Sequence, residues 1–132
     1  MFPLVDFLNR MAYDGPGPSH SPLRYAEESL AYWSGRGLAR DQTVLGVPFY
    51  SRPTEVPYRK LVAASAAAPN ADELDYLGTT VNYNGIATIK AKTELAMNRA
   101  SGIMVWSLAQ DTTDSTSLLG AIDATVRAAG RR

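Results

Sequence analysis

The chain alternates between short apolar runs and longer stretches in which apolar residues recur every three or four positions. The short runs are typical of buried strands, and the three-to-four spacing is typical of amphipathic helices. The apolar runs predict strands at residues 4–13, 43–50 and 102–108. The helical spacing predicts long helices at residues 21–37, 85–101 and 115–130. This order predicts an α/β fold with a parallel sheet that is buried on both faces.

Residues 51–84 interrupt this order after the second strand. Residues 58–70 predict a short helix that stops at Pro69, and residues 75–85 predict strand fragments with a turn at Asn84–Gly85. In α/β folds, a loop that follows the carboxyl end of a strand lies on the face that carries binding sites. The insertion is therefore expected on that face.

Local signals predict the helix ends and the burial of charge. Ser21 is expected to cap the first helix, with Pro22 in its first turn. Ser115 or Ser117 is expected to cap the last helix, and Asp111 to be a cap or loop residue. The lysines of the second long helix are expected to extend along the core and to keep their charges in water.

Each predicted strand ends in groups with functional chemistry. In chain order these are Tyr13 and Asp14, then Tyr50 and Arg52, then Trp106 with Gln110 and Asp111. Ligands of parallel α/β sheets bind at the carboxyl ends of the strands. Three successive units with an aromatic residue at this position predict one shared pocket.

Composition narrows the classes of function. Thirteen basic and thirteen acidic residues balance, so nucleic-acid binding has little support. The chain has no Cys and a single His, His20, so neither a metal site nor a cofactor is expected. No apolar stretch reaches the roughly 18 residues of a membrane span, and the N-terminus lacks the pattern of a signal peptide. Nucleic acid, membrane and metal are therefore not expected as partners.

Five motifs, in order, carry a resemblance to a known family. They are VDFLNRMAYD, SPLRYA, LGVPFYSR, NYNG and GIMVWSLAQD. Together they resemble the later part of the catalytic barrel of the family 18 glycoside hydrolases, the chitinases. The resemblance implies a partial TIM (β/α)8 barrel of about three β/α units, from strand six to the last helix. It also implies that residues 1–132 are the C-terminal part of that barrel, with a small α+β insertion at about 53–84.

The resemblance implies roles for the residues at the strand ends. In this family the N-acetyl group of the substrate itself attacks the anomeric carbon. Tyr13 would hold the N-acetyl carbonyl, and Asp14 would contact the sugar near the cleaved bond. Trp106 would form the floor beneath the sugar, because a flat indole stacks on the C–H face of a pyranose. The cleft would also be lined by Met11, Tyr50 and Arg52.

The catalytic acid of the family is absent from these residues. In the family it is a Glu that ends a DxxDxDxE motif, and no such motif occurs in the chain. The resemblance therefore implies a chitinase-like glycoside hydrolase in which this chain alone is inactive. Two alternatives stay open: a lectin-like protein that binds chitin or chito-oligosaccharides, and a half-barrel completed by a partner chain or by self-association. An extracellular location is expected from the resemblance alone.

Period-two alternation predicts an unfinished sheet face. It places Phe7 and Met11 on the face that would line a barrel, together with Pro48 and Met104 of the later strands. In the chain alone these four side chains are expected to be exposed to water, and the two edges of the sheet are expected to be unpaired. A marginally stable or self-associating chain is the expected consequence.

The same alternation points Arg10 toward the helices. An unpaired charge is costly in that position. Either an acidic partner, Asp6 or Glu28, or incomplete cover by the helix is therefore expected.

Overall fold

The computed structural model describes residues 2–130. Its main sheet is parallel, with the order β1-β2-β5, and consists of β1 (Leu8–Met11), β2 (Thr43–Pro48) and β5 (Gly102–Trp106). The long helices are α1 (Leu23–Ser34), α3 (Ile86–Arg99) and α4 (Leu118–Gly130). The predicted parallel α/β fold with three strand–helix units is confirmed, with shorter elements than the sequence predicts.

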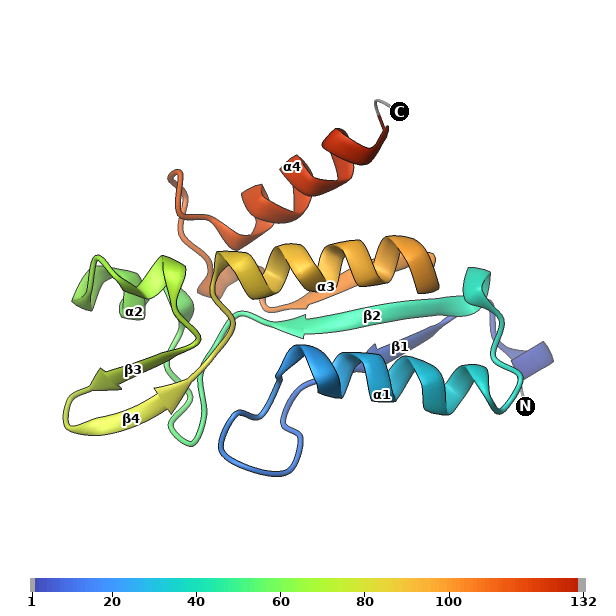
Figure 1. The fold of residues 1–132 in the computed structure, drawn as a ribbon, viewed down its shortest axis with the longest axis horizontal. Coiled ribbons are helices and arrows are strands. Elements are labelled where there is room, and N and C mark those ends of the chain that lie inside the picture. Colours follow the sequence, from blue (N-terminus) through green and yellow to red (C-terminus); the bar gives the residue numbers. More distant parts are fainter. Residues whose placement is uncertain (1, 131–132) are drawn as a thin grey trace.

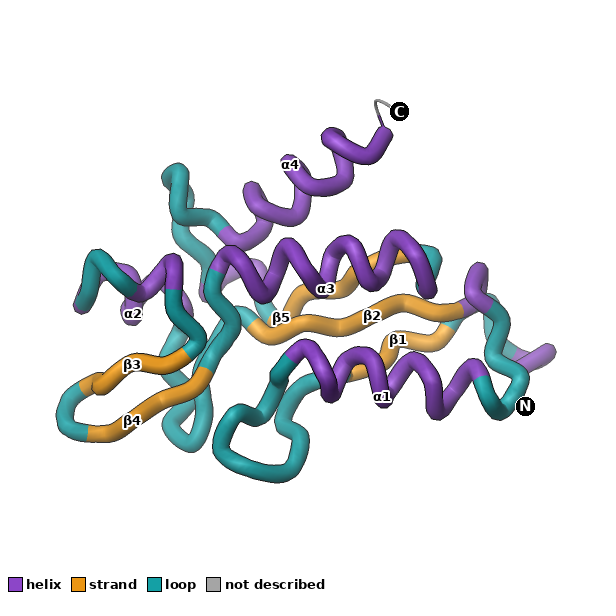
Figure 2. The backbone as a smooth tube through the Cα atoms, in the orientation of Figure 1, coloured by secondary structure: helices purple, strands orange, loops and turns teal. Residues whose placement is uncertain are grey.

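The long helices gather on one face of the sheet. Figure 1 shows α1 and α3 side by side in front of the strands, with α4 packed beside α3. The tube in Figure 2 shows β1, β2 and β5 behind this layer. The opposite face leaves Met11 and Trp106 largely exposed. The described residues therefore bury one face of the sheet, and the expectation of two buried faces is wrong for this chain.

The core lies between β2 and the helices. Leu45 and Val47 of β2 are fully buried, and they belong to one cluster with Leu30, Ile89 and Leu118. These side chains come from all three long helices and from the central strand. The core thus fixes the helix layer on the sheet through the hydrophobic effect.

Arg10 points into the helix layer, as the alternation predicts. Its guanidinium lies 4.5 Å from the centroid of the Trp33 ring and donates to Ser29 Oγ at 2.7 Å. No salt bridge to Asp6 or Glu28 occurs among residues 2–130, so the acidic partner is wrong, whereas the alternative of incomplete cover agrees with the half-buried side chain of Arg10. A hydroxyl and an aromatic face of α1 take the place of the acid, while partial burial lowers the pKa of Arg10.

The insertion contains α2 (Tyr58–Ala64) and an antiparallel hairpin of β3 (Glu73–Tyr76) and β4 (Thr79–Asn82). The hairpin turns at Leu77 and Gly78, which both have positive φ, 53° and 81°. The turn predicted at Asn84–Gly85 is wrong. That glycine instead passes close to another segment, because a Cβ atom on Gly85 would collide with the carbonyl oxygen of Ala71.

The start of α1 differs from the prediction. The helix begins at Leu23 with Pro22 as its N-cap, and no side chain caps it. Ser21 is therefore not the cap. Its hydroxyl donates to the carbonyl oxygen of Ala12 at 2.7 Å and ties the approach to α1 to the end of β1.

The start of α4 is capped by side chains. Ser117 Oγ accepts from the N–H of Gly120 at 2.9 Å, which confirms Ser117 rather than Ser115 as the cap. The carboxylate of Asp111 accepts from the N–H groups of Leu118 and Leu119, both at 2.9 Å. Asp111 is thus a capping residue, as expected.

The open face of the sheet is largely apolar. Phe7 is 56% exposed and Met11 is 63% exposed, as predicted. Met104 is half-buried, and Pro48 is buried, so the prediction of exposure is wrong for Pro48. Pro48 lies on the central strand, where it pairs with Trp106 of β5. The exposed apolar surface is therefore concentrated on the edge strands.

We expect the chain by itself to form species larger than a monomer, because both sheet edges and an apolar face are exposed. Replacing Phe7 and Met11 by Lys should shift the chain toward the monomer in sedimentation velocity. Leu77→Lys is the control, since Leu77 is 90% exposed at the distant hairpin turn, and it should leave the distribution unchanged. A native chain that sediments as a single monomer and unfolds cooperatively would contradict the prediction.

Candidate functional site

The parallel pairing brings the predicted site residues to one edge of the sheet. Met11 pairs with Gly46 of β2, and Pro48 of β2 pairs with Trp106. Tyr13 follows β1, and its ring reaches back over β2, because a Cβ atom on Gly46 would lie 3.2 Å from Tyr13 Cε1. Tyr13 and Trp106 therefore lie at the same end of the sheet, on the two strands that flank β2.

Gly46 makes room for this arrangement. A Cβ atom at this position would also lie 2.8 Å from the carbonyl oxygen of Arg10 and 3.0 Å from Met104 Cε. A larger residue on β2 would therefore push the Tyr13 ring away. Sequence reasoning missed this role, although a glycine inside an apolar strand is a recognised sign of close approach.

Tyr13 is a buried phenol beside a second one. Its ring meets the Tyr50 ring edge to face, with centroids 6.1 Å apart. Burial and then the charge of Asp14 raise the pKa of Tyr13. The hydroxyl therefore keeps its proton at neutral pH and can donate a hydrogen bond.

Asp14 is held by a forked interaction with Arg52. Arg52 Nε donates to Asp14 Oδ1 at 2.8 Å, and Arg52 Nη2 donates to Asp14 Oδ2 at 3.2 Å. This hydrogen bonding is the main cause that lowers the pKa of Asp14. The carboxyl group is thus ionised near neutral pH and is unsuited to act as a protonated acid there.

Arg52 is itself fixed from several sides. Its guanidinium lies 5.1 Å from the centroid of the Tyr50 ring and 3.3 Å from Glu55 Oε2. Its backbone exchanges two hydrogen bonds with Asn82, at 2.9 and 2.8 Å. The insertion therefore sets the position of the arginine that orients Asp14.

Tyr50 lies behind this group rather than at the surface. It is 2% exposed, and its pKa is raised by burial and then by the nearby Asp14 carboxylate. The Tyr50 ring packs against the ring of Tyr13 and the guanidinium of Arg52. The structure thus brings Tyr50 to the predicted site but does not place it on the open surface.

Trp106 and Met11 form the apolar, open part of the site. Trp106 is 56% exposed at the end of β5. Its carbonyl oxygen accepts from the N–H of Phe49 at 2.8 Å, which fixes the backbone next to β2. An exposed indole on a fixed backbone is an available stacking surface.

His20 is a further site residue that sequence reasoning missed. It is buried, and its ring nitrogens contact the backbone of both Asp14 and Tyr50. From the sequence His20 was considered only as a metal ligand. Within residues 2–130 no group of three His, Cys, Asp or Glu residues could hold a metal ion, and no helix there is long and apolar enough to span a membrane.

Lys92 anchors the loop beneath the site. Its side chain is fully buried, and Nζ donates to Ser21 O, Ser21 Oγ and Asn84 Oδ1 at 2.7, 2.6 and 2.6 Å. The expectation of a solvated charge is wrong for Lys92, because polar groups of two other segments satisfy the ammonium group. Burial lowers the pKa of Lys92 to about 7, while Asp72 acts in the opposite direction.

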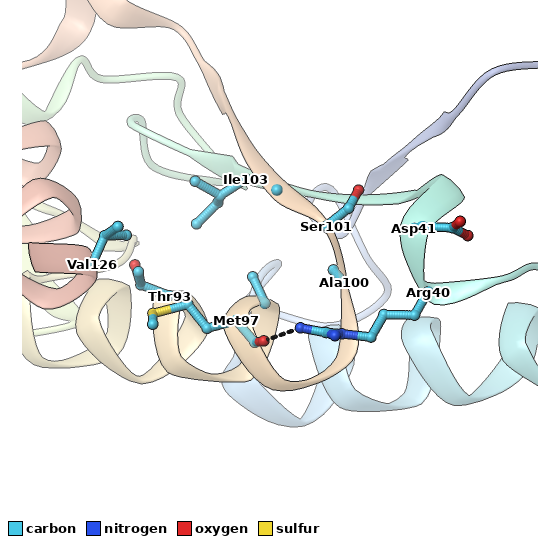
Figure 3. Close-up of a pocket in the computed structure, with 10 residues that line it drawn as sticks. Arg40, Asp41, Thr93, Met97, Ala100, Ser101, Ile103 and Val126 are labelled. Atoms are coloured by element: carbon cyan, nitrogen blue, oxygen red, sulfur yellow. Dashed lines mark hydrogen bonds between the residues drawn. The ribbon is translucent and has the colours of Figure 1, made fainter. Parts of the chain in front are cut away.

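A groove lies at the other end of the sheet. It has a volume of about 650 Å³ and is lined by Ile103 of β5, by Met97 of α3 and by Val126 of α4. Arg40, which precedes β2, closes it on one side by donating to the carbonyl oxygen of Met97 at 2.6 Å (Figure 3). This groove contains none of the predicted site residues.

A comparison of the sequence with known protein families identifies the family of this chain. The family described as glycosyl hydrolases family 18 matches residues 1–111. The chain belongs to glycoside hydrolase family 18. No curated protein matches the chain.

Solved structures agree with this assignment. The family 18 chitinase ChiB from the chitin utilization locus of Flavobacterium johnsoniae is 34% identical, with a TM-score of 0.82 over 91% of this chain and 42% of that chain. A chitinase of Bacteroides thetaiotaomicron is 24% identical, with a TM-score of 0.73 over 99% of this chain and 48% of that chain. A chitinase-like agglutinin of Robinia pseudoacacia is 20% identical, with a TM-score of 0.72 over 92% and 47%.

The matches also define the extent of the fold. The chain spans less than half the length of these three chains. The sheet of β1, β2 and β5 with its helices is therefore part of a family 18 barrel, and the predicted partial TIM barrel is confirmed. The open apolar face and the unpaired strand edges are what such a part exposes.

The burial of Lys92 predicts a pH dependence of stability. Its pKa is about 7 in the folded chain and about 10.4 in an unfolded chain. Between these pH values the unfolded state binds more protons, so the free energy of unfolding should rise with pH, by at most about 1.4 kcal/mol per pH unit. Urea unfolding at pH 7.5 to 9.5 measures this slope.

Two variants of α3 make the test specific. Lys92→Met should remove the rise, and Lys90→Met should keep it, because Lys90 is exposed on the same helix. Equal slopes in the two variants, or a flat profile for the native chain, would contradict the prediction.

Proposed function

We propose that this chain supplies the sugar-positioning part of a chitinase site, which hydrolyses β-1,4 linkages between N-acetylglucosamine units. The observation that carries the proposal is that Tyr13 and Asp14, which follow β1, and Trp106, which ends β5, lie at the same end of the parallel sheet. A phenol, a carboxylate and an exposed indole are suited to an amino sugar. They offer a donor for the acetamide oxygen, an acceptor for polar groups of the sugar and a stacking surface.

The proposed mechanism uses the N-acetyl group of the substrate as the nucleophile, as in family 18 generally. The protonated Tyr13 hydroxyl donates to the acetamide carbonyl and orients its oxygen toward the anomeric carbon. Trp106 supports the sugar ring from below. Asp14, ionised and fixed by Arg52, favours the positive charge that develops on the acetamide during attack.

The proton for the leaving oxygen comes from outside these residues in this proposal. Asp14 is the candidate carboxylate of the site, but hydrogen bonding to Arg52 lowers its pKa. A general acid needs a raised pKa, so that it keeps its proton near neutral pH. The DxxDxDxE motif of the family does not occur in the chain. The general acid is therefore assigned to the rest of the barrel, supplied by another segment or by a partner chain.

A second candidate function is the binding of chito-oligosaccharides without hydrolysis. The exposed Trp106, at the same end of the sheet as the fixed Tyr13 and Asp14, favours it, because stacking and hydrogen bonding need no general acid. The agglutinin of Robinia pseudoacacia, described as chitinase-like, shares the fold. Calorimetry of the chain with chitotetraose separates the candidates, since no heat at millimolar ligand would remove this one.

We expect the chain alone to release no product from a fluorogenic chitobioside, because general acid catalysis typically contributes about 10²–10⁴-fold. A chimera that adds the preceding barrel units of the Flavobacterium johnsoniae chitinase should release product. In this chimera Tyr13→Phe should lower kcat more than it raises KM, because the hydroxyl acts on the attacking acetamide. Product release by the chain alone, abolished by Asp14→Asn, would contradict the assignment of the acid.

Trp106→Ala should weaken the binding of chitotetraose by the chimera. One face of an indole buries about 100 Å², worth about 2.5 kcal/mol, so Kd should rise on the order of 70-fold. Leu108→Ala is the matched control, since Leu108 is 60% exposed two residues further along. Calorimetry of a chimera without its general acid measures both. Equal affinities of the Trp106→Ala and native chimeras would remove Trp106 from the sugar site.

A further inference from the structure

His20 lies in the loop between β1 and α1 and is almost fully buried. Its ring is 5.4 Å from the Tyr50 ring, centroid to centroid, at a tilt of 34°. Nδ1 lies 3.2 Å from the backbone nitrogen of Asp14, and Nε2 lies 3.3 Å from the backbone oxygen of Tyr50. One imidazole thus bridges the segments that follow β1 and β2.

These partners define the protonation of the ring. A backbone N–H can only donate, so Nδ1 must accept from Asp14. A backbone carbonyl can only accept, so Nε2 must carry the proton that it donates to Tyr50. The geometry therefore requires a neutral imidazole with its proton on Nε2.

The charged groups around the ring are consistent with the neutral form. Burial is the main cause that lowers the pKa of His20, and the cations Lys92 and Arg52 lower it further. The Asp14 carboxylate, 3.5 Å from Nδ1, acts in the opposite direction. Protonation at Nδ1 would remove the acceptor for the Asp14 N–H, so the two-sided bridge exists only in the neutral ring.

The bridge acts on a residue in an uncommon conformation. Asp14 has φ of 54°, in the left-handed region, which costs a non-glycine residue energy unless its surroundings hold it there. The loop is closed by a second bond, from the N–H of Gly15 to the carbonyl oxygen of His20 at 2.8 Å. Its far end is anchored next to His20, where Ser21 binds Ala12 and Lys92.

We propose that His20 is a positioning residue, whose neutral ring fixes the backbone of Asp14 against the end of β2 and thereby aims the Asp14 carboxylate into the sugar site. It does not touch the substrate. This proposal deepens the proposed function and depends on it for its effect on hydrolysis, while the bridge itself can be tested without substrate.

Selective ¹⁵N labelling of histidine gives a direct test, because His20 is the only His of the chain. The Nε2 signal is expected in the protonated range and the Nδ1 signal in the unprotonated range, and both should hold at pH values below about 6.5, where a free imidazole gains a proton. Averaged signals that titrate near pH 6.5 would overturn the bridge, whether or not the chain binds sugar.

Two substitutions distinguish the effect of the hydrogen bonds of His20 from the effect of the volume of its ring. His20→Gln keeps one acceptor and one donor at a similar separation, whereas His20→Phe keeps an aromatic ring without either. In the phenylalanine variant the Asp14 pKa, followed by carboxyl ¹³C shifts, should rise toward the ordinary value of about 3.9. In the glutamine variant it should stay low. A low Asp14 pKa in both variants would overturn the proposal.

The chimera with the Flavobacterium johnsoniae units then links the bridge to hydrolysis. His20→Phe should lower kcat about tenfold or more with a smaller change in KM, and His20→Gln should restore most of it. Tyr83→Phe is the control, because it removes a buried hydrogen bond to Ala68 in the insertion and should leave kcat and the Asp14 pKa unchanged. An inactive native chimera with the expected ¹⁵N pattern would reject the proposed function and keep the bridge. Full activity in His20→Phe would reject the positioning role.

Discussion

Parallel hydrogen bonding of β1 and β5 to the two edges of β2 holds Met11, Gly46 and Met104 in one row across the sheet. This register decides where every strand ends. Tyr13 and Trp106 are about ninety positions apart in the chain, and they lie at the same end of the sheet because parallel strands all present their carboxyl ends on the same side. A shift of one residue in either pairing would turn Met11 or Trp106 toward the helices. The chemistry at this edge therefore follows from strand register, and Gly46 gives it the space it needs.

The polar and apolar parts of the site are held in different ways. Asp14 and Arg52 are fixed by contacts inside the chain: a forked ion pair, a ring beneath the guanidinium and a backbone bridge to the insertion. Trp106 has a fixed backbone but an exposed ring. The orienting groups are thus formed within these residues, while the stacking surface lies on the open face of the sheet.

Much of the fold follows from the sequence by local rules. Apolar runs and helical spacing predict β1, β2, β5 and the three long helices, and parallel topology then predicts that their ends converge. The hairpin turn was misplaced because Asn84–Gly85 carries the standard signal for a turn with positive φ, whereas the chain turns at Leu77, a residue that rarely adopts it. Local rules thus fail where a tertiary contact, here between Gly85 and Ala71, uses the glycine for another purpose.

Long-range polar contacts explain why Lys92 and His20 could not be predicted. Lys92 and Ser21 are 71 residues apart, and His20 and Tyr50 are 30 residues apart, so no spacing in the sequence links them. Each is buried only because its donors and acceptors are satisfied. Lys92 holds the base of the loop with a group that donates three times, and His20 holds its top with a ring that both donates and accepts. A lysine could not replace the histidine, since an ammonium group has no acceptor for the Asp14 N–H. Two buried side chains of different chemistry, Lys92 and His20, therefore fix the loop that carries Asp14. Lys92 supplies donors where the surrounding groups are acceptors, and His20 supplies one donor and one acceptor where its neighbours need both.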